Sequence, residues 1–448
     1  MFANRITTKS AAARRFSLSL LLLAVFSPVP SPPQEAAGPA VDMTPVQPES
    51  VGFSSQRLER LHTLMQQVVD KKELAGAVTI LARHGKIVDY RAYGMRDLAT
   101  STPMTNNTIF RDYSMTKPVT GVAMLILYEQ GKWLPTDPIS KFIPEFAHLK
   151  VFDGFDATGK MILVNPDHAP TMRELMTHTA GFSYGDGEGP VDEMYQKLDI
   201  RHATTFKEMI DGLAQVPLNY QPGTRWRYSL SMDIEGYIVE KLSGQSLPDF
   251  MHDQIFAPLG MKDAGFFVPA DKRSRFATLY ENDGHDGVQP DTTNGSGMGD
   301  FLSPPTRPSG GGGLVSTAED YYRFAQMLGN SGQLDGVRIL APSSVRLMDT
   351  NHLSPSLITG GFHVGSQNFR PGFGYGYNCA VLYDPQEADL PDGKNTFFWD
   401  GAAGTWFWVD PTNDIVFVGM IQRMKGGSPN MQYTTRQLVY QALVDPSK

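Results

Sequence analysis

The stretch Phe110–Val119 reads F-R-D-Y-S-M-T-K-P-V and leads into an apolar helix that the pattern predicts over Met115–Gln130. Ser114 comes three residues before Lys117, so helical spacing places both side chains on one face, one turn apart. Pro118 fits a first helical turn, where its missing N–H has no partner within the helix. A lysine buried near the positive end of a helix dipole has a lowered pKa. The pattern therefore predicts a serine nucleophile with a lysine beside it whose pKa is lowered towards the range of a useful base.

A second serine competes for this role. Gly181–Gly185 reads G-F-S-Y-G, which fits the G-x-S-x-G pattern of many esterases. That pattern requires a strand before the serine and a helix after it. Here Met172–Thr177 has a helical pattern, and the residues after the serine, Y-G-D-G-E-G-P, are typical of turns. We therefore predict that Ser183 lies in a loop after a helix cap and that Ser114 is the nucleophile.

Strand signals are concentrated at the two ends of the chain. Ser54–Val69 has the apolar spacing of a helix, and residues 77–94 hold two strand-like runs around the turn H-G-K, which predict a β-hairpin. Residues 396–421 contain three short β-rich runs, and a last helix is predicted over Thr434–Leu443. This order of elements predicts an α+β fold, in which both chain ends form one antiparallel sheet flanked by helices.

The middle of the chain is predicted to be mostly helical, with a long loop near its end. Helical patterns recur over Phe206–Leu213, Met232–Leu242 and Ala318–Leu328. The stretch Glu281–Gly313 is rich in Gly, Pro, Asn, Asp and Ser, which predicts a loop. We expect one main region over residues 41–448, with an α/β part (about 48–112 and 310–448) and a helical part (about 113–309).

The N-terminus has the features of an export signal. Arg14 and Arg15 precede the apolar run Phe16–Phe26, and Pro- and Ala-rich sequence follows as far as Ala40. This order predicts a secretory signal peptide and linker over residues 1–40, and a secreted or periplasmic protein. The apolar run is too short to span a bilayer comfortably, so we expect no stable membrane anchor.

Composition excludes several classes of protein. The 448 residues carry a net charge of −8 and no basic run, so nucleic-acid binding is not expected. The single cysteine, Cys379, cannot form an internal disulfide, and its apolar surroundings predict a core residue. Asp283, His285 and Asp286 lie close together, but their spacing matches no metal site, so we predict a solvated loop and no metal. No signal for the oligomeric state is present.

Further motifs carry a resemblance to a known family. Y-S-L begins at Tyr228 before a predicted helix, and W-D-G-A-A-G-T begins at Trp399 on a predicted strand. With S-M-T-K, L-M-T-H-T-A-G-F and G-G-G-G-L-V-S-T-A-E-D, they resemble the class C β-lactamase-like serine hydrolases. Within these, the chain is most similar to the β-lactamase-like carboxylesterases (family VIII esterases), over about Pro48–Leu443. The resemblance implies a β-lactamase/penicillin-binding-protein-like fold and no cofactor.

The resemblance also implies roles for individual residues. Ser114 would be acylated, and Lys117 and Tyr228 would share the transfer of protons, with the base left open between them. A tyrosine beside an ammonium group is expected to have a lowered pKa. The backbone N–H groups of Ser114 and Ala402 would form the oxyanion hole, in which the loss of one donor costs roughly 10²–10³ in rate.

Two departures from the family pattern bear on the substrate. β-Lactamases and D,D-peptidases have K-T-G where this chain has Trp399, Asp400 and Gly401. Tryptophan cannot pair with an anion, and Asp400 would repel one. Leu230 replaces the asparagine of the Y-x-N motif. We therefore expect a small-molecule, neutral, short-acyl ester that these four residues bind, with Trp399 either a pocket wall or a core residue.

Several alternative functions are also compatible with the sequence. The chain could be a β-lactamase or D,D-peptidase that acts on peptidoglycan-type substrates, an acyltransferase, or a catalytically silent binding protein. The intact set of Ser114, Lys117 and Tyr228 argues against a silent protein. His178 in T-H-T-A-G is predicted to be structural, at a helix end. Loop aromatics are further pocket candidates: Tyr184, Phe373, Tyr375 and Tyr377.

Overall fold

The computed structural model describes Met1 and residues 42–448, except 286, 294, 296–298, 360–361, 365–366, 370 and 425–429. The predicted signal peptide and Asp286 lie outside the described residues. The described residues from 42 to 448 belong to one compact unit. Within the described residues, none of the helices has the length and apolar character needed to cross a membrane.

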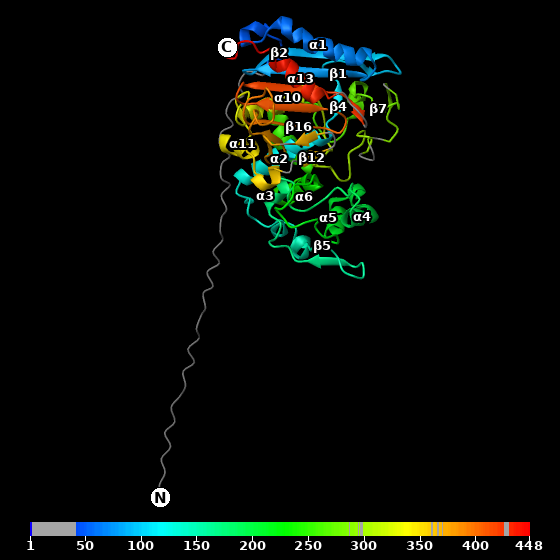
Figure 1. Ribbon diagram of the computed structural model, residues 1–448, viewed down its shortest axis with the longest axis vertical. Helices are drawn as coiled ribbons and strands as arrows, with labels where there is room; N and C mark the ends of the chain where they lie inside the picture. Colours follow the sequence, from blue (N-terminus) through cyan, green and yellow to red (C-terminus); the bar gives the residue numbers. More distant parts are fainter. Residues whose placement is uncertain are drawn as a thin grey trace. The chain divides into compact units, whose positions relative to one another are not determined.

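An eight-stranded sheet joins the two ends of the chain, as predicted (Figure 1). Every neighbouring pair in it is antiparallel, and the two ends meet where β18 pairs with β1, from Val78 opposite Met420 to Arg83 opposite Ile415. The strands β1 and β18 are buried along their whole length, which explains their continuous apolar sequence. In spatial order the strands are β14 (Phe373–Tyr375), β15 (Ala380–Leu382), β16 (Thr396–Asp400), β17 (Trp406–Asp410), β18 (Ile415–Met420), β1 (Gly76–Arg83), β2 (Lys86–Asp97) and β3 (Thr102–Pro103).

Helices from both ends of the chain cover this sheet. The helix α1 (Ser55–Asp70) packs against β2 and against α13 (Met431–Tyr440), so the first and last helices lie side by side. The helix α10 (Ala318–Gly329) packs on β1, β17 and β18. It begins with a capping box, in which Thr317 accepts from the N–H of Asp320, and that carboxylate receives the N–H of Thr317 in return.

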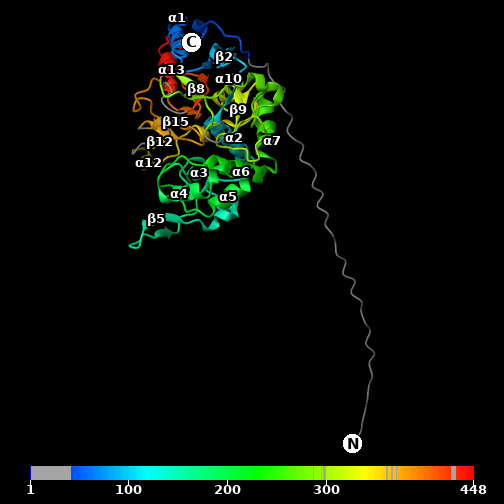
Figure 2. The same ribbon diagram turned by 90° about the vertical axis from the view of Figure 1, so that its right-hand side faces the viewer.

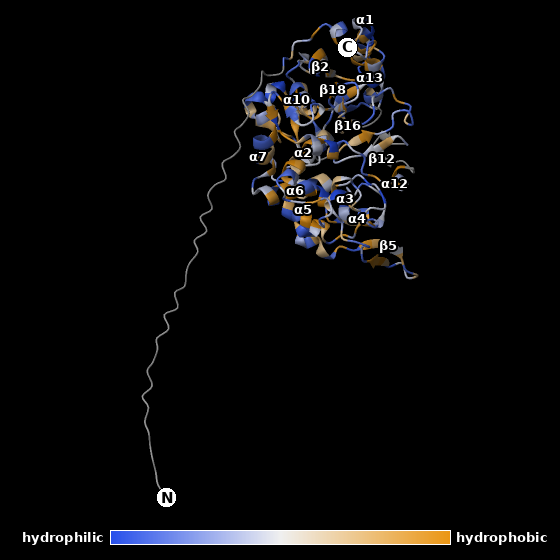
Figure 3. Ribbon diagram, turned by 90° about the vertical axis from the view of Figure 1, so that its left-hand side faces the viewer, coloured by the Kyte–Doolittle hydropathy of each residue, from blue (hydrophilic) through white to orange (hydrophobic). Residues whose placement is uncertain are grey.

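The middle of the chain is mostly helical, as predicted, and the labels α3 to α6 lie in the lower part of the compact unit in Figures 1 and 2. The helix α2 (Thr116–Glu129) lies at the centre of the compact unit in Figure 3 and packs against α6, with nearly all of its residues buried. This burial follows from its apolar sequence, which leaves no polar face for water. The other elements are β5 (Val151–Phe155), β6 (Met161–Val164), α3 (Met172–Met176), α4 (Pro190–Lys197), α5 (Phe206–Leu213), α6 (Ser231–Ser243), α7 (Leu247–Met251) and α8 (Ala257–Leu259).

The predicted loop over Glu281–Gly313 is not wholly irregular. Its start belongs to β7 (Tyr280–Asn282), which pairs with β8 (Val288–Pro290) and, on its other side, with β19 (Arg423–Met424). The prediction was wrong at these short strands, because β7 has a nearby partner in β8 and a distant one in β19, and no local pattern indicates the distant partner. Six short elements lie between α10 and β14: β10 (Gln333–Leu334), β11 (Val337–Arg338), α11 (Pro342–Met348), α12 (Pro355–Thr359), β12 (Phe362–Val364) and β13 (Gln367–Phe369).

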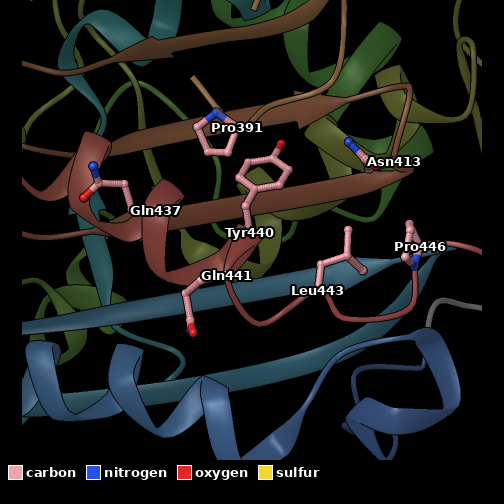
Figure 4. Close-up of a pocket in the computed structure, with 7 residues that line it drawn as sticks. All are labelled: Pro391, Asn413, Gln437, Tyr440, Gln441, Leu443 and Pro446. Atoms are coloured by element: carbon pink, nitrogen blue, oxygen red, sulfur yellow. The ribbon is translucent and has the colours of Figure 1, made fainter. Parts of the chain in front are cut away.

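A surface hollow lies beside α13 and the C-terminal tail (Figure 4). Tyr440 lines it, and its hydroxyl donates a 2.6 Å hydrogen bond to the buried Asp410 carboxylate. The side chain of Asn413, which also lines the hollow, donates to the same carboxylate. These polar groups are therefore used to fasten the last helix to the turn between β17 and β18.

Candidate active site

Ser114 lies in a 3-10 turn, Tyr113–Met115, directly before α2. The turn is fixed by a two-stranded ladder, in which β4 (Ile109–Arg111) pairs with β9 (Val315–Thr317). Tyr113 has a φ of 46°, in the left-handed region. This conformation costs a residue with a Cβ atom roughly 1–2 kcal/mol, and such strain is concentrated at functional sites.

The structure brings together the three predicted catalytic side chains. The Tyr228 hydroxyl donates a 2.6 Å hydrogen bond to Ser114 Oγ, and Lys117 Nζ donates one of 3.1 Å to the same oxygen. Lys117 Nζ also donates to the carbonyl of Gly311 at 2.6 Å and lies 4.4 Å from the centroid of the Tyr228 ring. The serine oxygen is therefore held by groups from α2 and from the loop before α6, while the segment before β9 holds the lysine.

Burial determines the charge of Lys117. Its side chain is 0% exposed, and this burial lowers the pKa to about 7 from 10.5. The carboxylates of Asp233, Asp400 and Glu235 oppose the shift only in part. The pKa of Lys117 is therefore lowered, as the sequence predicts.

The expected lowering of the Tyr228 pKa is not found. Burial raises the pKa of its hydroxyl, and the carboxylates of Asp400 and Asp233 raise it further. Hydrogen bonds with Ser114 and Trp399 lower the pKa, but they do not offset the burial. The prediction was wrong because a short sequence motif does not reveal how completely the ring is enclosed. Tyr228 is therefore a protonated hydrogen-bond donor near neutral pH.

A glycine allows the end of β16 to approach the serine turn. A Cβ atom on Gly401 would lie 2.2 Å from the carbonyl oxygen of Asp112 and 2.3 Å from Thr405 Oγ1. Because Thr405 Oγ1 also donates to that carbonyl, the strand end and the turn are joined directly. This close approach places Ala402 and Ser114 on the wall of one cavity, as the predicted oxyanion hole requires.

The cavity at Ser114 has a volume of about 200 Å³. Leu230, a predicted substrate-binding residue, lines it together with Ala402 and Met424, so the wall is partly apolar. Polar side chains also line it, from residues that the sequence did not single out: Asp186, Arg201, Asp233, Arg307 and Ser309, and Gly311 and Gly312 of the G-G-G-G-L-V-S-T-A-E-D motif add backbone groups. The run of glycines at 310–313 was a possible signal, because glycine marks close approaches of the backbone.

Trp399, Asp400 and Gly401, which stand in place of K-T-G, lie behind the cavity wall. Trp399 is 2% exposed, and its ring packs at 5.8 Å from the Tyr228 ring and 5.4 Å from the Tyr375 ring. It therefore supports Tyr228 as a core residue, which decides between the two predicted alternatives. Asp400 and Gly401 are also absent from the described cavity wall, and Asp400 acts on Lys117 and Tyr228 through its charge.

Ser183 has a structural environment, as predicted. It is 0% exposed, its hydroxyl donates to the Asp192 carboxylate, and its oxygen accepts from the N–H of Gly185 at 3.0 Å. Arg227 holds the other oxygen of Asp192 at 2.7 Å. Each polar group of this serine is therefore engaged in fixing the loop after α3.

His178 supports Tyr228 from the side. Its Nδ1 lies 3.0 Å from Ser229 Oγ, and its ring lies 4.9 Å from the Tyr228 ring. Burial keeps the pKa of the imidazole well below its usual value, so the ring is neutral. These contacts agree with the predicted structural role.

The other sequence candidates are also placed. Tyr184 lines the cavity, whereas Phe373, Tyr375 and Tyr377 are buried in or beside β14. Cys379 is buried, as expected. Among the described residues, no group of three or more His, Cys, Asp or Glu side chains could hold a metal ion.

Comparisons with known proteins agree with this geometry. The Beta-lactamase family profile matches residues 61–441. The chain belongs to the Beta-lactamase family. Protein Rv1367c of Mycobacterium tuberculosis is 38% identical over 364 residues, which cover 80% of this chain and 88% of that protein. Esterase EstB of Burkholderia gladioli is 33% identical over 370 residues, which cover 78% of this chain and 86% of that protein.

A solved structure shows the same fold. The structure described as "EstCE1, a hydrolase with promiscuous acyltransferase activity" superposes with a TM-score of 0.71 at 28% identity, covering 86% of this chain and 99% of that one. This Beta-lactamase family protein is therefore a serine hydrolase with the β-lactamase/penicillin-binding-protein-like fold.

Proposed function

We propose that this Beta-lactamase family protein hydrolyses carboxylic esters with short acyl groups through an acyl-Ser114 intermediate. The observation that carries the proposal is the pair of hydrogen bonds to Ser114 Oγ, from Tyr228 at 2.6 Å and from Lys117 at 3.1 Å. A serine is a weak nucleophile until a neighbouring base removes its proton, and a lysine with a pKa of about 7 is such a base. The similarity to Esterase EstB supports the choice of an ester substrate.

In the acylation step, neutral Lys117 accepts the Ser114 proton while the serine oxygen bonds to the ester carbonyl carbon. The N–H groups of Ser114 and Ala402 then stabilise the negative charge on the carbonyl oxygen. When the carbon–oxygen bond to the alcohol breaks, the alcohol receives a proton from Tyr228, which Lys117 restores. Water then attacks the acyl group, with the same residues in the reverse order, and releases the acid and free Ser114.

The cavity wall supports a small acyl group that is uncharged next to the serine. Leu230, Ala402 and Met424 offer apolar contacts, and about 200 Å³ leaves room for only a short chain beside the serine. Trp399 stands where β-lactamases and D,D-peptidases carry a lysine for the substrate carboxylate. Both features favour esters over β-lactams.

The test compares two substrates and two serine variants. Wild-type protein is expected to hydrolyse p-nitrophenyl butyrate much faster than nitrocefin, and Ser114→Ala to lose the ester activity. Ser183→Ala is the matched control, because it removes another buried serine hydroxyl within the same region. Ester turnover that survives in Ser114→Ala but not in Ser183→Ala contradicts the proposal, and efficient nitrocefin hydrolysis with little ester turnover favours a β-lactamase.

A further inference from the structure

One cation on the cavity wall is not used by the mechanism above. Arg201 belongs to the 3-10 turn Ile200–His202, which lies before α5, and it lines the same cavity as Ser114. Its guanidinium carbon lies 5.9 Å from the centroid of the Tyr184 ring, and Lys117 Nζ lies 5.6 Å from the same centroid. Arg201 and the catalytic lysine therefore both lie beside the Tyr184 ring.

The other charged groups on the wall already have partners. Asp233 accepts from Ser309 Oγ at 2.6 Å and lies 3.4 Å from a guanidinium nitrogen of Arg307. Arg307 also donates to the carbonyl oxygens of residues 201 and 203. Asp186 lies 3.9 Å from Arg227. In the described part of the chain, the Arg201 guanidinium has neither an ion pair nor a hydrogen bond, so it is the lining cation that remains available.

We propose that Arg201 binds a carboxylate at the end of the ester substrate that lies away from the reacting carbonyl. This proposal rests on the proposed ester hydrolysis at Ser114. A guanidinium group presents two parallel N–H donors that match a carboxylate, which Lys117 cannot do while it serves as the base. Arg201 thus supplies, from the helical region, the cationic contact that Trp399 cannot make in place of the K-T-G lysine. The part of the acyl group next to Ser114 remains uncharged, and the carboxylate lies beside the Tyr184 ring.

The experiment uses pairs of esters that differ only in this charge. Monomethyl adipate and its neutral amide, methyl adipamate, place the group on the acyl side. The compounds 4-butyryloxybenzoate and 4-butyryloxybenzamide place it on the alcohol side. Products are separated by chromatography, and kcat/KM for each carboxylate is divided by that for its amide, for the wild type and for each variant.

The expected result is a ratio well above one for one of the two pairs, which also identifies the side that carries the charge. Arg201→Gln lowers this ratio roughly 10- to 100-fold, mainly through KM, since a charged hydrogen-bonding pair is lost. Arg201→Lys retains the charge but lacks the two parallel N–H donors, so its kcat/KM ratio is expected to lie between those of the wild type and Arg201→Gln. Arg225→Gln is the matched control: Arg225 lies over the Tyr220 ring at 6.0 Å, it is exposed and it does not line the cavity.

Two failures are distinguishable. The role of Arg201 alone is overturned if the esters that carry a carboxamide are hydrolysed in a Ser114-dependent way and the kcat/KM ratio is near one for both pairs. It is also overturned if a ratio above one persists in Arg201→Gln. Wild-type protein that hydrolyses none of the four esters overturns the proposed function itself. Thermal unfolding of Arg201→Gln and Arg201→Lys shows whether either variant is folded, so a loss of fold is not taken for a loss of recognition.

Discussion

The lowered pKa of Lys117 predicts a defined dependence of the esterase rate on pH. An ordinary lysine with a pKa of 10.5 is neutral in about one molecule in three thousand at pH 7, whereas a pKa of about 7 leaves about half of the molecules neutral. Burial therefore increases the active, neutral form roughly a thousandfold at this pH. Because protonated Lys117 cannot accept the serine proton, kcat/KM falls as the pH falls, by about tenfold for each pH unit below the pKa.

The measurement is kcat/KM for p-nitrophenyl butyrate between pH 5 and 9, corrected for uncatalysed hydrolysis. We expect a rise to a plateau with an inflection near pH 7 and a loss of roughly 50- to 100-fold between pH 7 and pH 5. A profile that is flat between pH 5 and 8, or that keeps rising towards pH 10, refutes the assignment of Lys117 as the base.

Two buried carboxyl groups require a control, because burial raises the pKa of each to about 8. They are Glu235, which accepts from the side chain of Asn378, and Asp112, which accepts from Ser316 Oγ. The variants Glu235→Gln and Asp112→Asn are expected to retain an inflection at or below pH 7. If the inflection disappears in either variant, that carboxyl group is the one that titrates.

Three further substitutions test individual contacts of the site. Tyr228→Phe removes the 2.6 Å donor to the serine and is expected to lower kcat/KM roughly 10²- to 10⁴-fold, while thermal melting changes little because the packed ring remains. Ser183→Ala leaves Asp192 without one donor and is expected to lower the free energy of unfolding by about 1–3 kcal/mol in urea titrations, with p-nitrophenyl butyrate turnover per folded molecule retained. Gly401→Ala would force a Cβ atom to within 2.2 Å of the Asp112 carbonyl, so esterase activity is expected to fall at least tenfold; unchanged activity would show that the strand end does not need this approach.

The sequence predicts the catalytic set because each member lies in a short local motif. Ser114 and Lys117 are one helical turn apart, and Tyr228 stands directly before a helix, so local spacing and motif order suffice. The sheet is predictable for a related reason, since β1 and β18 consist mostly of apolar residues and are bounded by turn residues.

Other parts of the site depend on contacts between distant segments. The carbonyl of Gly311 accepts from Lys117 because the pairing of β9 with β4 brings the segment before β9 next to α2. No sequence pattern near residue 311 predicts this pairing. Arg201 stands in a short turn with no motif around it. The direction of the Tyr228 pKa also requires knowledge of burial, which depends on packing by His178 and Trp399 from other elements.

Burial changes the protonation of the whole region around α2 in a consistent way. The same exclusion of water that lowers the pKa of Lys117 to about 7 raises the pKa of Glu235 to about 8, and Asn378 joins the two by donating to the Lys117 carbonyl and to the Glu235 carboxyl group. The charge of ionised Glu235 is one of those that oppose the lowering of the Lys117 pKa, so protonation of Glu235 removes this opposition and favours the neutral lysine. A buried carboxyl group in its neutral form therefore preserves the base, which explains how an acidic side chain is compatible with this position behind Lys117.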